Sequence, residues 1–322
     1  MVCLLFPGQG SQAPGMGRFL FDQFKVAQDV FQEGSQALGL DLKKLCFESD
    51  EKTLALTENT QPALLCVSTA AFRILKTEVN LIPDSAAGHS IGEYAALVAA
   101  GSLAFSEAIK AVRVRGQAMQ SAVPVGQGGM TAVLGLEDEQ VRFLCEWTVK
   151  KSGFSPLSPA NFNSPGQVVI SGSMKALNWL KENFDASVIP GEAKRAKLIP
   201  LTVSAPFHCD LMKPAEEKMR QVLSEIQFKD AAFPIVQNFT ADFVSDAATL
   251  RENLIRQVSA PVLWTQSVKK IREHGTAQGI ECGHGKVLAG LIKKIDPEFK
   301  VWANQSLEDL ELIKKNLKAS GH

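Results

Sequence analysis

Residues 88–92 (GHSIG) place a serine between two glycines in the pattern G-x-S-x-G. A short apolar run, 85–87, precedes this pattern and a helix-forming run, 93–100, follows it. Such a strand–turn–helix elbow lifts a serine hydroxyl clear of the backbone and leaves no room for flanking side chains. It also aims the Ile91 N–H at the place where an oxyanion would form, near the positive end of the helix dipole. A turn serine without chemistry is the alternative, but the flanking strand and helix favour a nucleophile at Ser90.

A nucleophilic serine needs a base, because a free hydroxyl is weakly nucleophilic at neutral pH. Among the five histidines, His208 lies in a loop after an expected strand, where α/β proteins gather catalytic residues, and we choose it. His89 should point away from the neighbouring serine, while His274 and His322 lie at a polar helix end and at the chain terminus. His284 could be structural or near the site. No carboxylate stands out as a third member, so a backbone carbonyl could fix the tautomer and leave a Ser–His dyad.

A third candidate is Arg115, on a helix expected over 106–122 and capped by Ser106. Val112 and Met119 mark the apolar face of this helix, and Arg115 borders that face. A guanidinium near a core is costly unless it meets an anion, and its planar fork suits a carboxylate. The partner could be a glutamate of this protein or a substrate carboxylate, and periodicity alone favours the glutamate.

The glycine-rich loop 6–12 (FPGQGSQ) follows the first expected strand, 2–6. Its glycines let backbone N–H groups approach an anion, so the Gln9 N–H is a plausible second oxyanion donor. The loop lacks the Lys-Ser/Thr ending of a phosphate-binding P-loop. No set of His, Cys, Asp and Glu has metal-ligand spacing, and we expect no metal.

Composition is that of an ordinary globular chain: 322 residues, 45% hydrophobic and 21% charged. Lys+Arg and Asp+Glu both number 34, and this zero net charge argues against a nucleic-acid binder. The six cysteines form no C-x-x-C pair, which predicts reduced, buried thiols. No segment is typical of a signal peptide or a membrane helix. We therefore expect a cytoplasmic protein.

A breaker-rich stretch at 124–129 (PVGQGG) marks an expected domain boundary. After it, the patterns predict strands and helices in the order β-α-β-β-α-β, which is the ferredoxin-like arrangement. The expected elements lie at 130–134, 137–150, 157–162, 168–171, 175–184 and 196–201. We therefore expect a small domain, 125–201, inserted into a large domain formed by 1–124 and 202–322. In the large domain, helices are expected over 25–38 and 60–78, and over 211–226, 265–273 and 286–294. The last three alternate with short strands, which predicts a parallel sheet covered by helices.

The motifs together resemble the malonyl-CoA:acyl carrier protein transacylases of bacterial fatty acid synthesis and the related acyltransferase domains of polyketide synthases. The matches run in the family's order from the first strand almost to the C-terminus. They are FPGQGSQ at 6–12, GHSIGEY at 88–94, RVRG at 113–116, NFNSPGQ at 161–167, PFH at 206–208, RQ at 256–257 and PVLW at 261–264.

The resemblance implies a role for each candidate residue. Ser90 would be the acylated nucleophile, His208 its base, and Arg115 the partner of the malonyl carboxylate. The N–H groups of Gln9 and Ile91 would form the oxyanion hole. The backbone of Gln257 would orient His208 in place of a carboxylate.

The resemblance also implies an α/β-hydrolase-like large domain with a ferredoxin-like insertion. The reaction would be ping-pong transfer from malonyl-CoA to the phosphopantetheine thiol of acyl carrier protein, without a cofactor, and we expect a monomer. Two positions depart from the family. His284 stands where the family often has Pro. Phe207 stands where many stand-alone relatives have Ser, and with Ile91 it predicts malonyl over methylmalonyl, because a bulky ring would crowd an α-methyl group.

Three alternatives stay open at this point. An acyl-thioester or serine hydrolase would discharge the acyl-enzyme to water, although the arginine and the missing triad acid weigh against it. A trans-acting polyketide-pathway acyltransferase is barely separated by the sequence. A non-catalytic carrier-protein docking module would not require Ser90, His208 and Arg115 together.

Overall fold

The computed structural model describes residues 1–191 and 196–319. Its large sheet is built around β1 (Val2–Phe6), whose five residues are apolar and buried. The strand order is β10-β9-β1-β2-β7-β8. The other strands are β2 (Ser85–Gly88), β7 (Ile235–Val236), β8 (Phe243–Val244), β9 (Gln278–Glu281) and β10 (Lys300–Ala303). All neighbours are parallel except β7 and β8, so the expected parallel sheet is a mixed one with an antiparallel edge.

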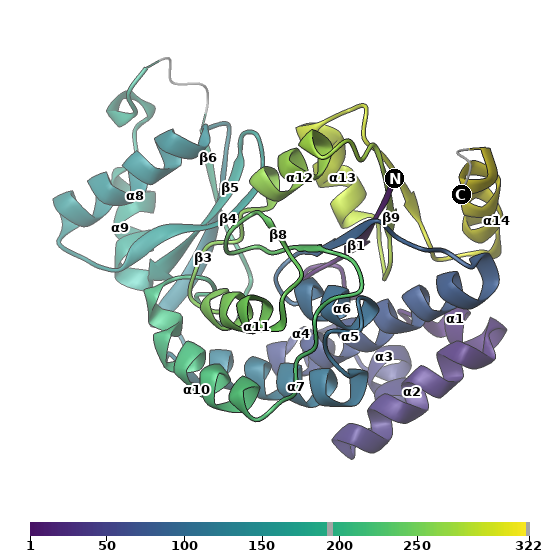
Figure 1. Cartoon of the computed structure of the whole chain (residues 1–322). Helices are drawn as coiled ribbons and strands as arrows, with labels where there is room; N and C mark the ends of the chain where they lie inside the picture. Colours follow the sequence, from purple (N-terminus) through teal and green to yellow (C-terminus); the bar gives the residue numbers. More distant parts are fainter. Residues whose placement is uncertain (192–195, 320–322) are drawn as a thin grey trace.

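Helices cover both faces of this sheet, because alternate residues of a strand point to opposite sides. On β1, Leu4 and Phe6 join one apolar cluster while Cys3 and Leu5 join another. Figure 1 shows α5, α6 and α7 below the sheet and α12 and α13 above it. The helices of the large lobe are α1 (Arg18–Gln23), α2 (Lys25–Leu38), α3 (Leu42–Glu48), α4 (Glu51–Ala55), α5 (Thr57–Ile74), α6 (Gly92–Ala99), α7 (Phe105–Ser121), α10 (Lys213–Ser224), α11 (Ala247–Arg256), α12 (Trp264–Glu273), α13 (Val287–Ile295) and α14 (Leu307–Ala319).

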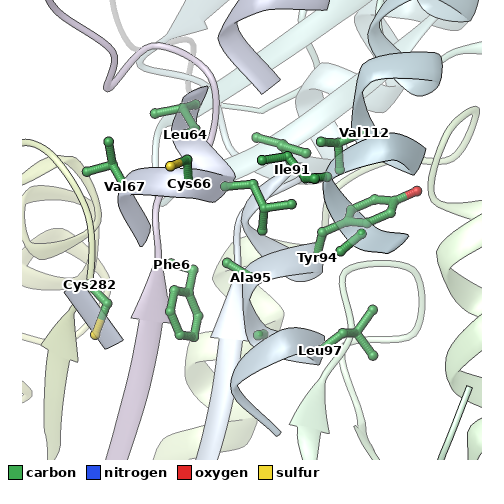
Figure 2. Packing of buried hydrophobic residues seen from close by; sticks show 14 of the residues in the cluster. Phe6, Leu64, Cys66, Val67, Ile91, Tyr94, Ala95, Leu97, Val112 and Cys282 are labelled. Atoms are coloured by element: carbon green, nitrogen blue, oxygen red, sulfur yellow. The ribbon is translucent and has the colours of Figure 1, made fainter. Parts of the chain in front are cut away.

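The central helix α6 is wrapped by apolar neighbours. Figure 2 shows Ile91, Tyr94 and Ala95 between Phe6 of β1 and Val112 of α7. All of these side chains are at most 2% exposed. The helix that follows the serine is therefore held on several sides, which gives the turn before it a fixed position.

The small lobe is a four-stranded antiparallel sheet of order β4-β5-β3-β6. Its elements follow one another as predicted: β3 (Gly128–Leu134), α8 (Asp138–Ser152), β4 (Leu157–Ser164), β5 (Gln167–Ser173), α9 (Met174–Asn183) and β6 (Lys197–Pro200). The two helices pack on the sheet through one apolar cluster that includes Leu144, Phe162, Ile170 and Leu180. Figure 1 shows this lobe beside the large sheet.

Several local predictions were wrong. Ser106 does not cap α7, because the helix begins at Phe105 and Ala104 is the N-cap residue without a side-chain bond. The helix expected over 60–78 begins at Thr57 and continues after Ile74 as a π-helical turn, Leu75–Val79. Helix α11 had no expected counterpart.

The six cysteines are free and buried as predicted. His322 lies outside the described residues.

No helix among the described residues is long and apolar enough to cross a membrane.

Candidate active site

Ser90 lies on a sharp turn between β2 and α6, as the G-x-S-x-G pattern predicts. Its φ of 51° is in the left-handed region, which is uncommon for a residue with a side chain. A Cβ added to Gly88 would lie 2.0 Å from the backbone carbon of Gly92, and one added to Gly92 would lie 2.1 Å from the Phe6 oxygen. Both glycines are therefore required by the close approach of backbone to backbone, and the predicted strand–turn–helix context is confirmed.

His208 meets the serine across 118 residues of sequence: its Nε2 lies 2.8 Å from Ser90 Oγ. Its Nδ1 lies 2.9 Å from the Gln257 carbonyl oxygen and 3.1 Å from that of Ala260. A carbonyl can only accept, so Nδ1 carries the hydrogen and Nε2 presents its lone pair to the serine hydroxyl. The predicted chain of serine, imidazole and backbone carbonyl is present, with a second carbonyl that the sequence did not indicate.

The protonation state of His208 suits a base. Burial, with the positive charge of Arg115 as the second cause, lowers the pKa of His208 to about 3. Desolvation and a nearby cation both disfavour the imidazolium. The imidazole is therefore neutral at ordinary pH and can accept the serine proton.

Arg115 is 1% exposed, and its hydrogen-bond partners are neutral. Its guanidinium donates to the side-chain oxygens of Gln61 and Gln257, both at 2.9 Å, and to Ser90 Oγ at 3.2 Å. Among the described residues no carboxylate forms an ion pair with it, so the glutamate partner favoured by helical periodicity is not found. The charge of Arg115 is oriented beside the serine. Glu93, the buried carboxyl that interacts with it electrostatically, forms no ion pair with it.

The three groups line one cavity of about 180 Å³. Gln9 and Ile91, the expected oxyanion donors, line it too, and so does Phe207. The small lobe and the chain that leaves it add four apolar lining residues, Met130, Val169, Leu201 and Val203, and the small lobe also adds Asn161 and Asn163. The cavity thus combines a polar floor at the elbow with an apolar side, as small-molecule sites commonly do.

Sequence reasoning missed the amides that organise this floor. The Gln257 side chain contacts Arg115 and also donates to the Ser90 carbonyl at 3.0 Å. Gln61 was predicted only as part of a helix, and the sequence did not indicate its contact with Arg115. His89 points to Asn163 of β4, 2.8 Å away, and so away from Ser90 Oγ as expected. His284 is half-buried and is absent from the cavity lining.

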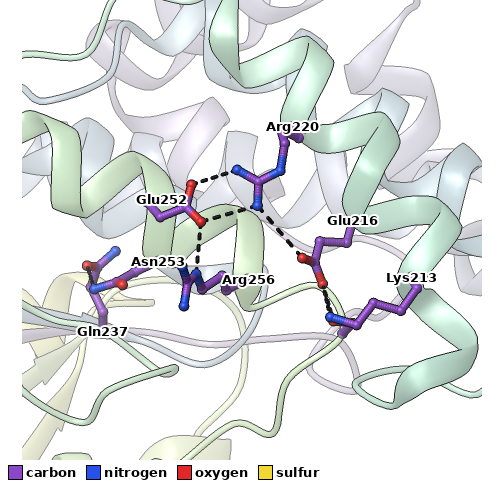
Figure 3. Close-up of polar contacts among 8 residues, drawn as sticks. Lys213, Glu216, Arg220, Gln237, Glu252, Asn253 and Arg256 are labelled. Carbon is purple, nitrogen blue, oxygen red and sulfur yellow. Dashed lines mark hydrogen bonds and ion pairs between the residues drawn. The ribbon is translucent and has the colours of Figure 1, made fainter.

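The carbonyls that hold His208 belong to a segment tied to two helices. Ser259 donates to Glu216 of α10 in a short contact. Figure 3 shows Glu216 in contact with Lys213 and Arg220, while Arg220 and Arg256 both bind Glu252 of α11. Exposed ion pairs of this kind contribute about 0–1 kcal/mol each. These pairs connect α10 and α11 near residues 257–260, the segment whose carbonyls hold His208.

No group of three or more His, Cys, Asp or Glu side chains within 1–191 and 196–319 is arranged to hold a metal ion.

The mixed sheet between helices and the Ser90–His208 pair at the strand–turn–helix elbow define an α/β enzyme with a nucleophilic serine. The acyl transferase domain family matches residues 3–313. The chain belongs to this family, and within it to the malonyl CoA-acyl carrier protein transacylases.

The relatives match over nearly their whole lengths. The malonyl CoA-acyl carrier protein transacylase of Bacillus subtilis (strain 168) is 43% identical over 317 residues, covering 98% of this chain and 97% of that protein. The solved structure of the Coxiella burnetii transacylase superposes with a TM-score of 0.92 at 37% identity, covering 98% and 97% of the two chains. A malonyl-transacylase solved in complex with its type II PKS acyl-carrier protein gives a TM-score of 0.91 at 40% identity, covering 98% and 99%.

Proposed function

We propose that this protein transfers a malonyl group from malonyl-CoA to the phosphopantetheine thiol of an acyl carrier protein, through an acyl-enzyme on Ser90. The observation that carries the proposal is the state of Arg115: a buried guanidinium 3.2 Å from Ser90 Oγ with amides, and no carboxylate, as partners. An acyl group with its own free carboxylate supplies the missing anion. The names of the full-length relatives support the same substrate and acceptor.

In the first half-reaction, Ser90 Oγ attacks the thioester carbonyl carbon while His208 Nε2 takes the hydroxyl proton. The carbonyl oxygen becomes an oxyanion, for which the N–H groups of Gln9 and Ile91 are the proposed donors. Collapse of the intermediate breaks the C–S bond, and His208 returns its proton to the departing CoA sulfur. Throughout, Arg115 would hold the malonyl carboxylate by two parallel hydrogen bonds.

The second half-reaction reverses these steps with a different thiol. The phosphopantetheine thiol gives its proton to His208 and its sulfur attacks the ester carbon on Ser90. The C–O bond then breaks and the serine recovers its proton from His208. Every group needed is a side chain or a backbone N–H or carbonyl of this chain, so the proposed reaction uses no cofactor.

Selection between malonyl and methylmalonyl groups is assigned to Phe207. This ring is 8% exposed and lines the cavity beside His208. An α-methyl group would need the space that the ring occupies, and close-packed side chains yield little room. We propose that the enzyme prefers malonyl-CoA, and comparable turnover of the two thioesters would contradict this.

The finer description of the fold is also a proposal. We assign 1–124 and 202–322 to an α/β-hydrolase-like catalytic domain and 125–201 to a ferredoxin-like insertion. The parallel order β9-β1-β2-β7 around the elbow supports the first assignment. The antiparallel order β4-β5-β3-β6, with both helices packed on that sheet, supports the second. We place the protein in the cytoplasm, where its substrates would be found.

Two related activities compete with this proposal. A hydrolase would use the same serine, but attack by water does not require Arg115, and it would release the acyl group as a free acid. A polyketide-pathway acyltransferase acting in trans would use the same site with another carrier, and one similar structure is such a transacylase with its carrier. The acceptor, and not the chemistry, distinguishes it.

The test is to mix the protein with malonyl-CoA labelled in the acyl group, map the covalent label by mass spectrometry, and then add carrier protein. We expect label on Ser90 that moves to the phosphopantetheine thiol. Label that is released to water at the same rate with and without carrier would establish a hydrolase. Running fatty acid and polyketide carriers in parallel identifies the preferred acceptor.

A further inference from the structure

A buried asparagine outside the sequence motifs spans the nucleophile turn. Asn238 follows β7, the strand next to β2, and its side chain is fully buried. Its Oδ1 accepts from the Ser90 N–H at 2.7 Å, and its Nδ2 donates to the Gly88 carbonyl at 2.7 Å. One planar amide thus binds the backbone on both sides of His89, immediately before the nucleophile.

Only an amide offers a donor and an acceptor side by side in this geometry. A carboxylate would set an acceptor against the Gly88 carbonyl, and an aliphatic side chain would leave both backbone groups unpaired in a buried place. The backbone of Asn238 is used as well: its carbonyl accepts from the Leu263 N–H at 3.1 Å. The residue is therefore committed on every polar atom.

The position of Asn238 is itself set from the elbow helix. Its N–H donates to Glu93 Oε2 at 2.7 Å, and the other carboxylate oxygen accepts from Gln237 Nε2 at 3.1 Å. Glu93 is fully buried in the first turn of α6, three residues after the nucleophile. Gln237 is in turn held by Asn253 of α11, at 2.9 Å (Figure 3). Residues 237–238 and the elbow are thus joined by four hydrogen bonds in a closed ring.

This ring bears on the strained part of the site. Ser90 has a φ of 51° without being a glycine, a conformation that persists only where the surroundings over-determine it. The Ser90 N–H bond and the Gly88 carbonyl bond fix the peptide planes around that conformation. Without them the turn can relax, which would carry Oγ away from its 2.8 Å contact with His208 Nε2.

We propose that Asn238 is a positioning residue that holds the Ser90 turn in its reactive conformation, with Glu93 fixing the asparagine in place. The inference rests on the proposed function, because it presumes that Ser90 is the group acylated. Asn238 touches neither the acyl group nor the departing thiol and acts only through the backbone of residues 88 and 90.

The experiment compares Asn238→Ala with wild type in the first half-reaction. Active sites are counted by the maximal label from malonyl-CoA, and the acylation rate constant is measured per labelled site. We expect that rate constant to fall about 100-fold, the scale of an ångström-sized misplacement. KM should change little, because Arg115 and the cavity walls are retained. A merely structural role would reduce the number of active sites and leave the rate constant per site unchanged.

Asn304→Ala is the matched control. Asn304 is also fully buried, and its Nδ2 donates to the Ala71 carbonyl at 2.8 Å, so Asn304→Ala removes a buried side-chain-to-backbone hydrogen bond away from the elbow. The Ala71 carbonyl keeps its bond from the Leu75 N–H. It should lose stability and keep its rate constant per site. If Asn304→Ala and Asn238→Ala lower that rate constant equally, the proposal is overturned.

Asn238→Asp provides a second arm that requires no loss of volume. The introduced carboxyl can donate to the Gly88 carbonyl only when protonated, so the ratio of variant to wild-type rate should rise as pH falls. The ionisable groups of the surrounding elements are Glu93 of α6, Arg115 of α7 and His208. The introduced carboxylate lies beside Glu93, so the two carboxyls take up protons as a coupled pair, and the rise of the ratio reports the pair. A ratio independent of pH would refute the clamp.

Failure of the proposed function has a different signature. In that case wild type itself acquires no malonyl label on Ser90, whereas failure of the clamp leaves wild type labelled and Asn238→Ala equally fast per site.

Discussion

Arg115 is the residue on which substrate choice depends in the proposed reaction. Two glutamine side chains orient its guanidinium, yet amides carry no charge, and Glu93, which interacts with Arg115 electrostatically, forms no ion pair with it. A hydrolase site for neutral esters would gain nothing from this arrangement. An anionic acyl group gains both a charge-assisted fork and a position beside Ser90 Oγ.

Arg115→Ala should therefore lower kcat/KM for malonyl-CoA by roughly 10- to 100-fold, the value of hydrogen bonds to a charged group. Acetyl-CoA, which has no free carboxylate, should be transferred at least as well as by wild type. The measurement is initial rate with each thioester. Arg113→Ala is the control, because Arg113 is partly exposed and binds Glu58 and Asn59 on the outer side of α7. An unchanged malonyl-to-acetyl ratio in Arg115→Ala would remove the residue from this role.

The pKa of His208 makes a separate prediction for the pH profile. Burial and the charge of Arg115 lower that pKa to about 3, so the neutral base persists well below the usual histidine range. The acylation rate should stay level as pH falls from 7 to about 5, where an ordinary histidine would already be largely protonated. With acetyl-CoA as substrate, Arg115→Ala removes one cause of the lowering, so the acid limb should move to higher pH. A wild-type limb near 6.5 would contradict this account.

At the residue scale, the sequence predicted the functional residues that stand in short contiguous motifs. Ser90, His208 and Arg115 each stand in a short motif with a chemical meaning. The side-chain contacts of Gln257 and Asn238 with the serine backbone could not be read from the sequence, because they join residues 167 and 148 positions apart. The Gln257 backbone role came from the resemblance, whereas its side-chain contact with Arg115 had no sequence signal at all.

At the scale of elements, the site depends on how closely α6 approaches β1. The Gly92 Cα lies so near the Phe6 carbonyl that no side chain fits, and the loop bearing Gln9 starts at that carbonyl. This contact fixes the distance between the two proposed oxyanion donors. It is a backbone-to-backbone contact, which cannot adjust by changing a rotamer.

Gly92→Ala should therefore destabilise the protein by about 3 kcal/mol or more, at the upper end of overpacking effects, and abolish acylation. Gly290→Ala is the matched control on α13, because a Cβ there meets nothing within 4 Å. It should stabilise by about 0.5–1 kcal/mol, the usual gain for alanine in a helix interior. Urea unfolding of both variants provides the free energies. Equal effects at the two glycines would show that the close approach is unimportant.

Element boundaries illustrate where sequence patterns carry information. The buried β1 and the amphipathic α2 were predicted with correct ends because their apolar patterns are clear and are bounded by Pro, Gly or polar residues. β8 has two residues and half-buried side chains, so no pattern could indicate it. α11 begins after Asp246, which caps it through the Thr249 N–H, but its polar surface hides the helical period.

At the scale of the whole molecule, the small sheet is joined beside the cavity to the segment of the large lobe that precedes α12. The Phe162 N–H of β4 donates to the Val262 carbonyl at 2.9 Å, and the Val262 N–H donates to the Ala160 carbonyl at 2.8 Å. The Thr265 hydroxyl of α12 adds a bond to the Phe162 carbonyl at 3.0 Å. Because β4 belongs to the small sheet, the cavity wall is tied to the large lobe by backbone as well as by side chains.

A sequence boundary at 124–129 suggests an insertion that could open independently, whereas this bridge favours a single cooperative unit. The amides of Phe162 and Val262 should therefore exchange with solvent only through global unfolding, with the same free energy as the most protected amides of β1 and β5. Native-state hydrogen exchange over a series of low denaturant concentrations measures this. His89→Ala, which removes the 2.8 Å contact with Asn163, should leave that equality intact because the backbone bridge remains. Exchange of Phe162 and Val262 at a clearly lower free energy than β1 and β5 would instead mean that the lobes separate while each stays folded, and that the cavity opens by their motion.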